Sequence, residues 1–204
     1  MNIFQIKTKP HGIERFNEFT QENFISIGWP GIGDLKDITK DEIRERLTKK
    51  TGYSGHKLGN ALGQVNAFIN TMKIGDVVLI TEKNWAYIGT IGEYMYDQQY
   101  DNENDGMCHR RSVKWTNRVP FRELPSGLQR LVNNRNTICR YPDLVEESGI
   151  DKITGKTPIM RKENNNELDG LFSEALLILG EELKSDEPDR RLKAAIEILR
   201  LKNR

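Results

Sequence analysis

The chain has 204 residues, of which 36% are hydrophobic and 30% charged, and its formal net charge is +1 at pH 7. This length suits one ordinary domain with an extension, and the near-neutral charge argues against a globally basic nucleic-acid binder. Because no stretch approaches the roughly 20 apolar residues of a membrane-spanning helix, and residues 1–7 lack the features of a signal peptide, we expect a cytoplasmic protein without a membrane partner.

The N-terminal part of the chain predicts short strands followed by a capped helix. Ile3, Phe4 and Ile6 indicate a short strand, and a brief apolar strand beginning at Phe24 runs into a loop rich in glycine and proline. Residues 39–42, Thr-Lys-Asp-Glu, fit a capping box, in which the threonine hydroxyl and the glutamate carboxylate each satisfy a free backbone amide. A helix over about 40–50 follows from it.

The central part of the chain predicts an amphipathic helix and the main strands of a sheet. The helix has apolar residues at alternating spacings of four and three, which should face the sheet: Leu58, Leu62, Val65, Ile69 and Met72. Strands are expected over 76–81, 85–94 and 111–116, and the connection between the first two has the length of a hairpin turn. A short helix near 126–132 and a strand near 137–141 close this unit.

The C-terminal 60 residues predict a linker and a helical pair. Residues 146–166 are polar and poor in periodicity, which indicates a linker. The first helix has an apolar stripe formed by Leu168, Phe172, Ala175 and Leu179, and the second has one formed by Leu192, Ala195, Ile196 and Leu199. We therefore divide the chain into a domain over 1–145, a linker over 146–166 and a helical hairpin over 167–204, which would mediate self-association or contact an effector protein.

Three segments in the first 142 residues carry a resemblance to a known superfamily. Residues 72–80, Met-Lys-Ile-Gly-Asp-Val-Val-Leu-Ile, and 87–93, Tyr-Ile-Gly-Thr-Ile-Gly-Glu, resemble consecutive barrel strands of the EVE and YTH branch of PUA-like domains. Residues 113–115, Val-Lys-Trp, look like the next strand. The segment 24–35 also looks like the N-terminal domain that precedes nuclease or ATPase modules in some bacterial restriction systems.

The resemblance implies an α/β (α+β) fold in which a twisted sheet curls into a partial barrel with helices around it. In YTH and EVE relatives, a pocket lined by aromatic rings grips a base, often a methylated one flipped out of its strand. By this resemblance we expect a module that recognises a nucleobase in DNA or RNA, with a role in bacterial or phage defence.

Trp29 is the leading candidate for the base-binding pocket. It lies in the glycine- and proline-rich loop, and by resemblance it matches the first cage tryptophan of the YTH pattern; the alternative is a tryptophan packed as a lid on the barrel. Ser26, in the preceding strand, is placed in the pocket with it, and so are Trp85, Trp115 and Tyr96, although core or rim packing is the commoner role of such residues. Residues 97–106 contain no tryptophan, which departs from the YTH pattern.

Charge is distributed unevenly along the second half of the domain. Residues 106–142 contain eight Arg or Lys and one acid, whereas residues 93–105 contain five acids and no base. Because basic residues interleaved with aromatics are typical of nucleic-acid binding, we expect Arg110, Arg111, Lys114 and Arg135 to contact the nucleic-acid backbone. The alternative is that the acidic segment folds back and neutralises part of the basic strand.

The sequence offers little chemistry for catalysis. Cys108 and Cys139 are 31 residues apart without a Cys/His cluster, which predicts free thiols and no metal, and the chain has no motif for a serine nucleophile, a phosphate-binding loop or a zinc protease. We therefore expect a binding module without a cofactor, not an enzyme. Two rival interpretations remain: a small-molecule or nucleotide sensor that uses the same pocket, and an interaction protein that acts through residues 167–204.

Overall fold

A computed structural model of the protein describes residues 1–154, 179, 182–183 and 187–202, and the chain divides into two compact units, Met1–Met160 and Arg161–Arg204. We describe each unit by itself. None of the helices in these residues is both long enough and apolar enough to cross a lipid bilayer.

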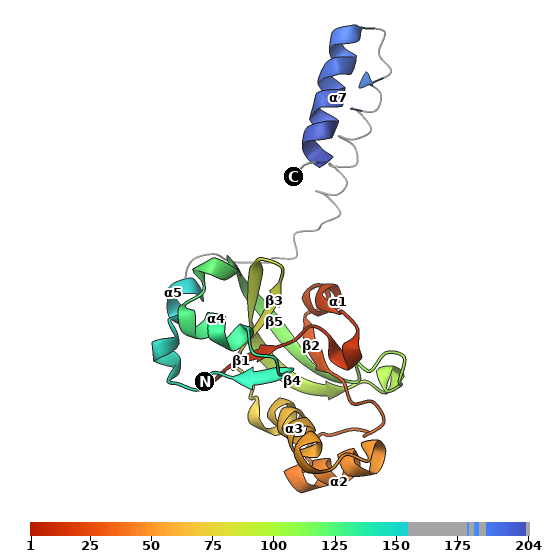
Figure 1. Cartoon of the computed structure of the whole chain (residues 1–204), viewed down its shortest axis with the longest axis vertical. Helices are drawn as coiled ribbons and strands as arrows, with labels where there is room; N and C mark the ends of the chain where they lie inside the picture. The colour runs from red at the N-terminus through yellow and green to blue at the C-terminus, as the bar shows by residue number, and fades with distance from the viewer. Residues whose placement is uncertain (155–178, 180–181, 184–186, 203–204) are drawn as a thin grey trace. The chain divides into compact units, whose positions relative to one another are not determined.

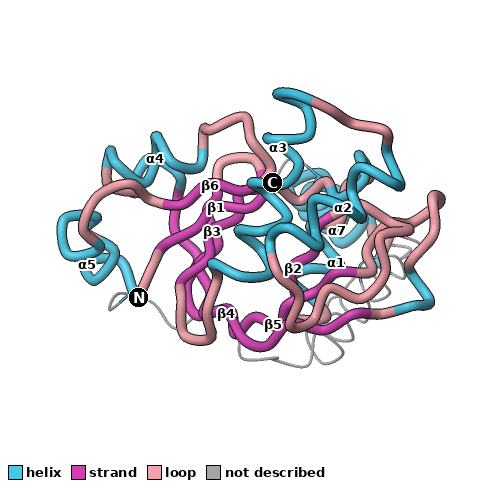
Figure 2. The backbone as a smooth tube through the Cα atoms, turned by 90° about the horizontal axis from the view of Figure 1, so that it is seen from below, coloured by secondary structure: helices cyan, strands magenta, loops and turns pink. Residues whose placement is uncertain are grey.

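Within residues 1–154, six strands form a mixed sheet that is the frame of the first unit (Figure 1). The strands are β1 (Ile3–Ile6), β2 (Phe24–Ile27), β3 (Val77–Glu82), β4 (Trp85–Tyr96), β5 (His109–Pro120) and β6 (Ile138–Arg140). Their order is β2-β5-β4-β3-β1-β6; β1 and β3 are parallel, and the other neighbours are antiparallel. The sheet is open, and Figure 2 shows it curling strongly between β6 and β2. The predicted α+β class with a curled sheet is therefore confirmed at this level.

Helices cover both faces of the sheet. On one side lie α1 (Phe16–Gln21), α2 (Lys40–Thr51) and α3 (Gly55–Asn66), which continues into the π-helical turn η2 (Ala67–Thr71); on the other lie α4 (Ser126–Val132) and α5 (Ile150–Thr154). Short 3₁₀ turns connect the elements: η1 (Pro10–Gly12), η3 (Gln98–Tyr100), η4 (Phe121–Glu123) and η5 (Val145–Ser148).

The alternation of side chains along each strand builds two hydrophobic cores. On β3, Val78 and Ile80 belong to the core beneath α2 and α3, whereas Val77 and Leu79 belong to the core beneath α4 and α5. Successive residues of a strand point to opposite faces, so a strand covered on both sides is apolar throughout. This is why residues 77–80 read as the uninterrupted run Val-Val-Leu-Ile.

The two helices expected from local patterns form as predicted. In the capping box of α2, the Thr39 N–H donates to Glu42 Oε2 over 2.7 Å and the Glu42 N–H donates to Thr39 Oγ1 over 3.3 Å. The predicted apolar stripe of α3 lies on the core, with Leu62 and Val65 buried. The end of α2 at Gly52, in the left-handed conformation, matters for the site because it turns the chain towards Tyr53.

Ordered structure continues past residue 145, so the first part of the predicted linker belongs to the first unit. Ile150 and Ile153 of α5 are buried in the second core, and the Asn117 side chain donates to the carbonyls of Ile153 and Thr154 over 3.2 and 3.1 Å. Two apolar residues in a five-residue helix are too few to produce a periodic signal, which is why the sequence did not reveal it. β5 is also longer than the predicted 111–116.

The second unit is described mainly by α7 (Pro188–Lys202). Pro188 is the first helical residue, a position that suits proline because its missing N–H is not needed in a first turn. Leu192 and Ile196 are 61% and 41% exposed. The other predicted helix, with its stripe over residues 168–179, lies almost wholly outside the described residues.

Candidate functional site

A cleft of about 420 Å³ lies beside Trp29. Five parts of the chain line it: residues 9–12 around η1, residues in 28–32 after β2, residues in 50–53 at the end of α2, Glu103 and Thr137. Its volume falls in the range of small-ligand sites, about 300–1,000 Å³. The cleft is therefore the candidate site, and it includes the leading residue predicted from the sequence.

Trp29 is held in an unusual backbone conformation. Its φ is 72°, in the left-handed region that bulky residues avoid, although it precedes Pro30, and the residue before a proline favours extended conformations. His11, also in the cleft wall, has φ 52°. Such conformations cost about 1–3 kcal/mol each and persist only where the surrounding structure imposes them.

Close packing of three chain segments imposes this geometry. A Cβ atom at Gly28 would lie 2.9 Å from the His11 backbone nitrogen, and one at Gly106 would lie 2.6 Å from His11 Cβ. His11 is thus wedged between two glycines that have no side chain to displace it. Glycine is required at both positions, so the loop after β2, η1 and the 97–106 segment form one rigid wall.

The strain at Trp29 predicts an unusual order of stability among its variants. Glycine adopts φ near 72° without a Cβ penalty. We therefore expect the free energy of unfolding of Trp29→Gly to be about 1 kcal/mol higher than that of Trp29→Ala. Urea denaturation of both variants measures this. Lys49 in α2 is the control, because Lys49→Gly should be less stable there than Lys49→Ala. An alanine variant at position 29 as stable as the glycine variant would contradict the strain.

Two aromatic residues and several cations line the cleft. Trp29 and Tyr53 are both half-buried and pack against the first core. Lys57 Nζ lies 3.8 Å from the centre of the Tyr53 ring, and Lys9 and Lys50 line the cleft directly. Of the described residues that line it, Glu103 alone carries a carboxylate. The cleft therefore offers flat apolar surfaces next to positive charge.

A buried histidine interacts with the loop that carries Trp29. His109 in β5 is buried, with Nδ1 2.9 Å from the Tyr94 hydroxyl oxygen, and that oxygen also accepts a hydrogen bond from the Leu35 N–H over 3.2 Å. His109 Nε2 is buried without a hydrogen-bond partner. Burial lowers the pKa of His109 to about 4, although the Asp101 carboxylate and the Trp29 carbonyl oppose this, so the ring is neutral near pH 7.

Asp101 ties the 97–106 segment to the cleft. Its carboxylate accepts hydrogen bonds from the Gly31 N–H and the Tyr96 hydroxyl, both over 2.5 Å. Burial would raise the pKa of Asp101, but these two hydrogen bonds lower it below its usual range, so it stays ionised. Burial and Asp101 raise the pKa of Tyr96. Tyr96 therefore positions the cleft wall through Asp101 and does not line the cleft itself.

Two predicted pocket residues are buried in the sheet instead. Ser26 is buried in β2, and its hydroxyl donates to the Ile27 carbonyl over 3.3 Å. Trp115 is buried in the first core, and its Nε1 donates to the Phe19 carbonyl over 3.0 Å. Neither lines the cleft, since both side chains are buried within the fold. Their predicted role in a pocket is corrected by this placement.

Trp85 does not line the cleft beside Trp29. It is the first residue of β4, at the opposite end of the strand from Tyr96. Trp85 is 36% exposed, and the Arg118 guanidinium lies 3.9 Å from its ring centre. The structure thus places Trp85 in a surface cation–π pair outside the cleft.

The two arginines predicted to contact phosphates are buried. Arg110 lies between the rings of Phe24 and Tyr100, at 4.6 and 4.0 Å, and pairs with Asp97 over 3.4 Å. The acidic segment does fold back on the basic strand, as the alternative interpretation proposed. Arg111 donates only to backbone carbonyls in the interior. Both side chains are engaged within the fold, and neither lines the cleft beside Trp29.

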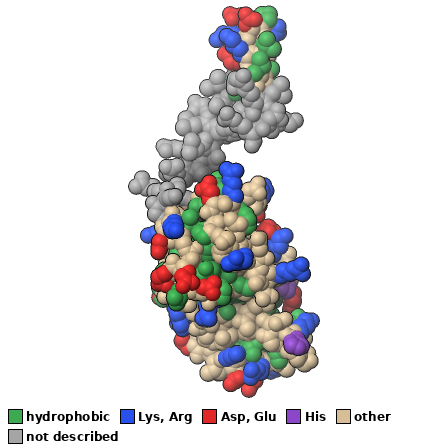
Figure 3. Space-filling view, turned by 60° about the vertical axis from the view of Figure 1, so that its left-hand side comes forward, with side chains coloured by type: hydrophobic (Ala, Val, Ile, Leu, Met, Phe, Trp, Pro, Cys, Tyr) green, Lys and Arg blue, Asp and Glu red, His purple; other side chains and the backbone are tan. Residues whose placement is uncertain are grey.

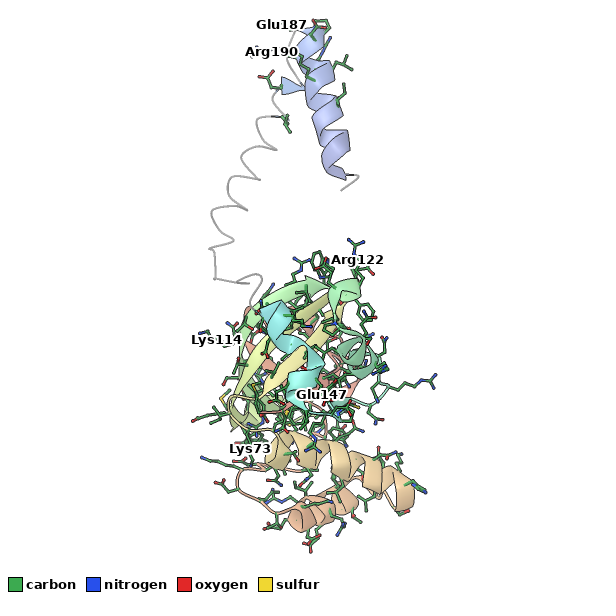
Figure 4. All side chains as sticks on the ribbon, turned by 90° about the vertical axis from the view of Figure 1, so that its left-hand side faces the viewer. Lys73, Lys114, Arg122, Glu147, Glu187 and Arg190 are labelled. Carbon is green, nitrogen blue, oxygen red and sulfur yellow. The ribbon has the colours of Figure 1, made fainter. Side chains whose placement is uncertain are left out.

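The other two predicted cations are exposed. Lys114 projects from β5 into solvent (Figure 4), and it is not one of the residues that line the cleft. Arg135 is exposed in the loop between α4 and β6, two residues before Thr137 of the cleft wall. Arg135 therefore stays a candidate for a contact with the nucleic-acid backbone near the cleft.

One face of the first unit is acidic. Figure 3 shows acidic side chains gathered on the side of the molecule that carries α5, and Glu147 lies on this side in Figure 4. Asp143 and Glu146, its neighbours in the chain, are exposed as well. A phosphate backbone would be repelled from this face.

Several residues of the cleft were not predicted from the sequence: Lys9, His11, Lys50, Tyr53 and Glu103. A signal for one of them was present, since Tyr53 stands between Gly52 and Gly55, as Trp29 stands among glycines. An aromatic residue in a glycine-rich connection has little local core to pack on, so the reasoning applied to Trp29 could have found Tyr53.

The thiols show no sign of a redox or metal site. Cys108 and Cys139 are both free, and burial raises the pKa of Cys108 to about 12, so it is an unreactive thiol. Among the described residues, no group of three or more His, Cys, Asp or Glu side chains is placed to hold a metal ion.

Comparison with known proteins identifies one relationship. A family model described as a domain of unknown function (DUF8426) matches residues 5–135, which is more than half of the chain. This span runs from β1 through α4 and contains Trp29, Tyr53 and Glu103 of the cleft. No curated protein matches the chain. The chain therefore belongs to the DUF8426 family.

Proposed function

We propose that the first unit is a binding module, not an enzyme, and that its cleft holds a nucleobase of DNA or RNA against Trp29. The observation that carries this proposal is the strained backbone of Trp29 at the wall of a cleft of about 420 Å³. Strained residues cluster at ligand sites, because a site needs its groups held where the ligand requires them.

The two aromatic rings of the cleft suit a planar base. A base stacked on an aromatic side chain contributes about 1–3 kcal/mol of binding energy. Tyr53 provides the second ring, in place of the tryptophan that YTH relatives carry in the segment corresponding to 97–106. Tyr96 is not proposed for this role, since its hydroxyl is engaged with Asp101.

The cations around the cleft suit the flanking phosphates. Lys9 and Lys50 line it, Lys57 lies over Tyr53, and Arg135 is exposed nearby in sequence to Thr137. Arg110 and Arg111 are buried, so in this proposal these residues contact the nucleic-acid backbone instead of them.

The proposal also includes the PUA-like relationship. An open, strongly curled mixed sheet with helices on both faces is compatible with the resemblance to EVE and YTH domains. That resemblance adds a modified base as the preferred ligand and a role in bacterial or phage defence.

A small-molecule or nucleotide sensor is the second candidate, and the volume of the cleft, which is in the range of small-ligand sites, favours it. The salt dependence separates the two. Polynucleotide binding releases many counterions and weakens steeply as salt is added, whereas the affinity of an uncharged small ligand changes little and that of a single nucleotide changes less steeply.

The third candidate concerns the second unit. The exposed Leu192 and Ile196 lie four residues apart on α7, which is the spacing of an apolar contact stripe. This favours self-association or an effector contact through residues 167–204, alongside either function of the cleft. Comparing the oligomeric state of the full chain with that of a Leu192→Glu variant tests it.

The test of the proposed function is binding of labelled single- and double-stranded oligonucleotides, with and without methylated bases, measured by fluorescence anisotropy over a salt series. We expect Trp29→Gly to weaken binding by about 5- to 150-fold, the equivalent of one lost stacking contact. Trp85→Ala is the control, because Trp85 is exposed outside the cleft, and it should bind like the wild type.

Two results would contradict the proposal. One is the absence of binding to any oligonucleotide at low salt. The other is binding that Trp29→Gly leaves unchanged, which would place the nucleic acid elsewhere on the surface.

A further inference from the structure

An ion pair inside the cleft marks the place of a negatively charged group. Lys50 Nζ lies 2.7 Å from Glu103 Oε1. His11 Nε2 donates to the Glu103 carbonyl over 2.9 Å and lies 3.6 Å from Glu103 Oε2. A carboxylate of the chain itself therefore occupies the positive end of a cleft whose other lining residues carry no acid.

The ammonium group of Lys50 is held in place by the loop that carries Trp29. A Cβ atom at Gly31 would lie 2.7 Å from both Cε and Nζ of Lys50, so the lysine side chain lies directly across the backbone of Gly31. Gly31 is fixed in turn, with φ 82° and its N–H bound to Asp101. Lys50 thus lies against Gly31, which is two residues after Trp29 in the chain, and both Lys50 and Trp29 line the cleft.

The Glu103 carboxylate is not needed to hold its own segment. Other side chains anchor residues 97–106: Asp105 pairs with Arg15 over 3.1 Å, Asp101 binds Gly31, and Asp97 pairs with Arg110. Glu103 is 64% exposed and Lys50 38% exposed in their ion pair, and exposed pairs contribute little to stability. The carboxylate can therefore swing away from Lys50 while the segment stays in place.

We propose that Lys50 forms a phosphate subsite of the cleft, which the Glu103 carboxylate occupies when no ligand is bound. The ligand would be a nucleotide or phosphodiester whose base stacks on Trp29 and whose adjacent phosphate replaces the carboxylate. This inference rests on the proposed function of the cleft.

The chemistry favours a phosphate over the carboxylate that it displaces. A phosphate offers more acceptor oxygens than a carboxylate, and a terminal phosphate also carries more charge at neutral pH. Lysine binds phosphate as a point charge and forms charge-assisted hydrogen bonds with it. Glu103 and Lys50 keep each other charged, since Glu103 raises the pKa of Lys50 and Lys50 lowers the pKa of Glu103.

The test measures binding of two probes by calorimetry: inorganic pyrophosphate, which has no base, and the tightest oligonucleotide from the anisotropy series. We expect Glu103→Gln to tighten both by about fivefold, because the internal competitor is lost. Lys50→Met should weaken both by about tenfold or more. Glu147→Gln and Lys49→Met make the same charge changes at exposed positions outside the cleft, and they should stay within about twofold of the wild type.

The two probes separate this inference from the function on which it rests. Oligonucleotide binding that Trp29→Gly abolishes but Glu103→Gln and Lys50→Met leave unchanged would overturn the subsite and keep the base-binding function. Pyrophosphate binding that responds to both variants, without binding of any oligonucleotide, would support the subsite and overturn base binding. If neither probe responds to Glu103→Gln and Lys50→Met, the subsite is wrong. A 5′-mononucleotide that binds as tightly as the oligonucleotide would identify a free nucleotide as the source of the phosphate.

Discussion

Replacing Arg111 by methionine is expected to lower the free energy of unfolding by about 3–5 kcal/mol. The buried guanidinium donates to four backbone carbonyls: Phe68 over 2.7 Å, Ile69 over 2.9 Å, Met72 over 3.1 Å and Gly92 over 3.0 Å. Three of these carbonyls end the helical segment formed by α3 and η2, where the last carbonyls have no helical partner. Methionine fills the space but leaves these acceptors without donors.

Urea denaturation measures this loss, and Lys114→Met is its matched control. Lys114 lies on the same strand but is exposed, so its replacement should change the stability by no more than about 0.5 kcal/mol. Arg111→Lys keeps the charge but has three donors in a different geometry, so it should lose a part of the stability. An Arg111→Met variant as stable as Lys114→Met would show that these carbonyls find other partners.

The free energy of unfolding is also expected to fall by about 3 kcal/mol between pH 6.5 and pH 4, because of His109. In the folded protein the pKa of His109 is about 4, whereas an unfolded chain has the ordinary value of about 6.5. Between these values the unfolded state binds a proton that the folded state does not. The stabilisation is therefore complete above pH 6.5, decreases as the pH falls, and is fully lost below pH 4.

Denaturation curves across this pH range measure the effect. In His109→Gln, which cannot be protonated, this part of the pH dependence should disappear, and what is left between pH 6.5 and 4 belongs to the carboxylates. Since the variant could fold less well, a second measurement is needed: the ring signals of His109 in NMR spectra of the folded wild type should not titrate above about pH 5. Titration of His109 near pH 6.5 would contradict its burial as a neutral ring.

The sequence by itself determined the elements whose causes are local. The capping box at Thr39 and the apolar stripe from Leu58 to Met72 depend only on residues within a few positions of each other, and both form as predicted. The uninterrupted apolar run at 77–80 became a strand covered on both faces. Trp29 was also identified from its local sequence, because a large ring in a glycine-rich loop has little local core to pack on.

Only the tertiary structure decided which charged side chains are exposed and which are engaged within the fold. Arg111 is buried because the end of η2, some 40 residues earlier in the chain, brings its carbonyls to β5. Arg110 is buried because the 97–106 segment folds back and places Tyr100 and Asp97 against it. Alternation along β5 places Arg111 on the buried face with Val113 and Trp115, whereas Lys114 is exposed. Arg110 falls on the same face as Lys114, so the sequence pattern could not separate these two.

The cleft itself is also a product of the tertiary structure. Its walls come from five parts of the chain that are far apart in sequence, and Lys50 and Glu103 acquire a common role only when these parts meet. The contacts that bring them together involve the left-handed turn at Gly31 and the packing of His11 between Gly28 and Gly106. Such contacts depend on the whole fold, because sequence periodicity carries information about neighbours along a helix or strand and none about which loops approach each other.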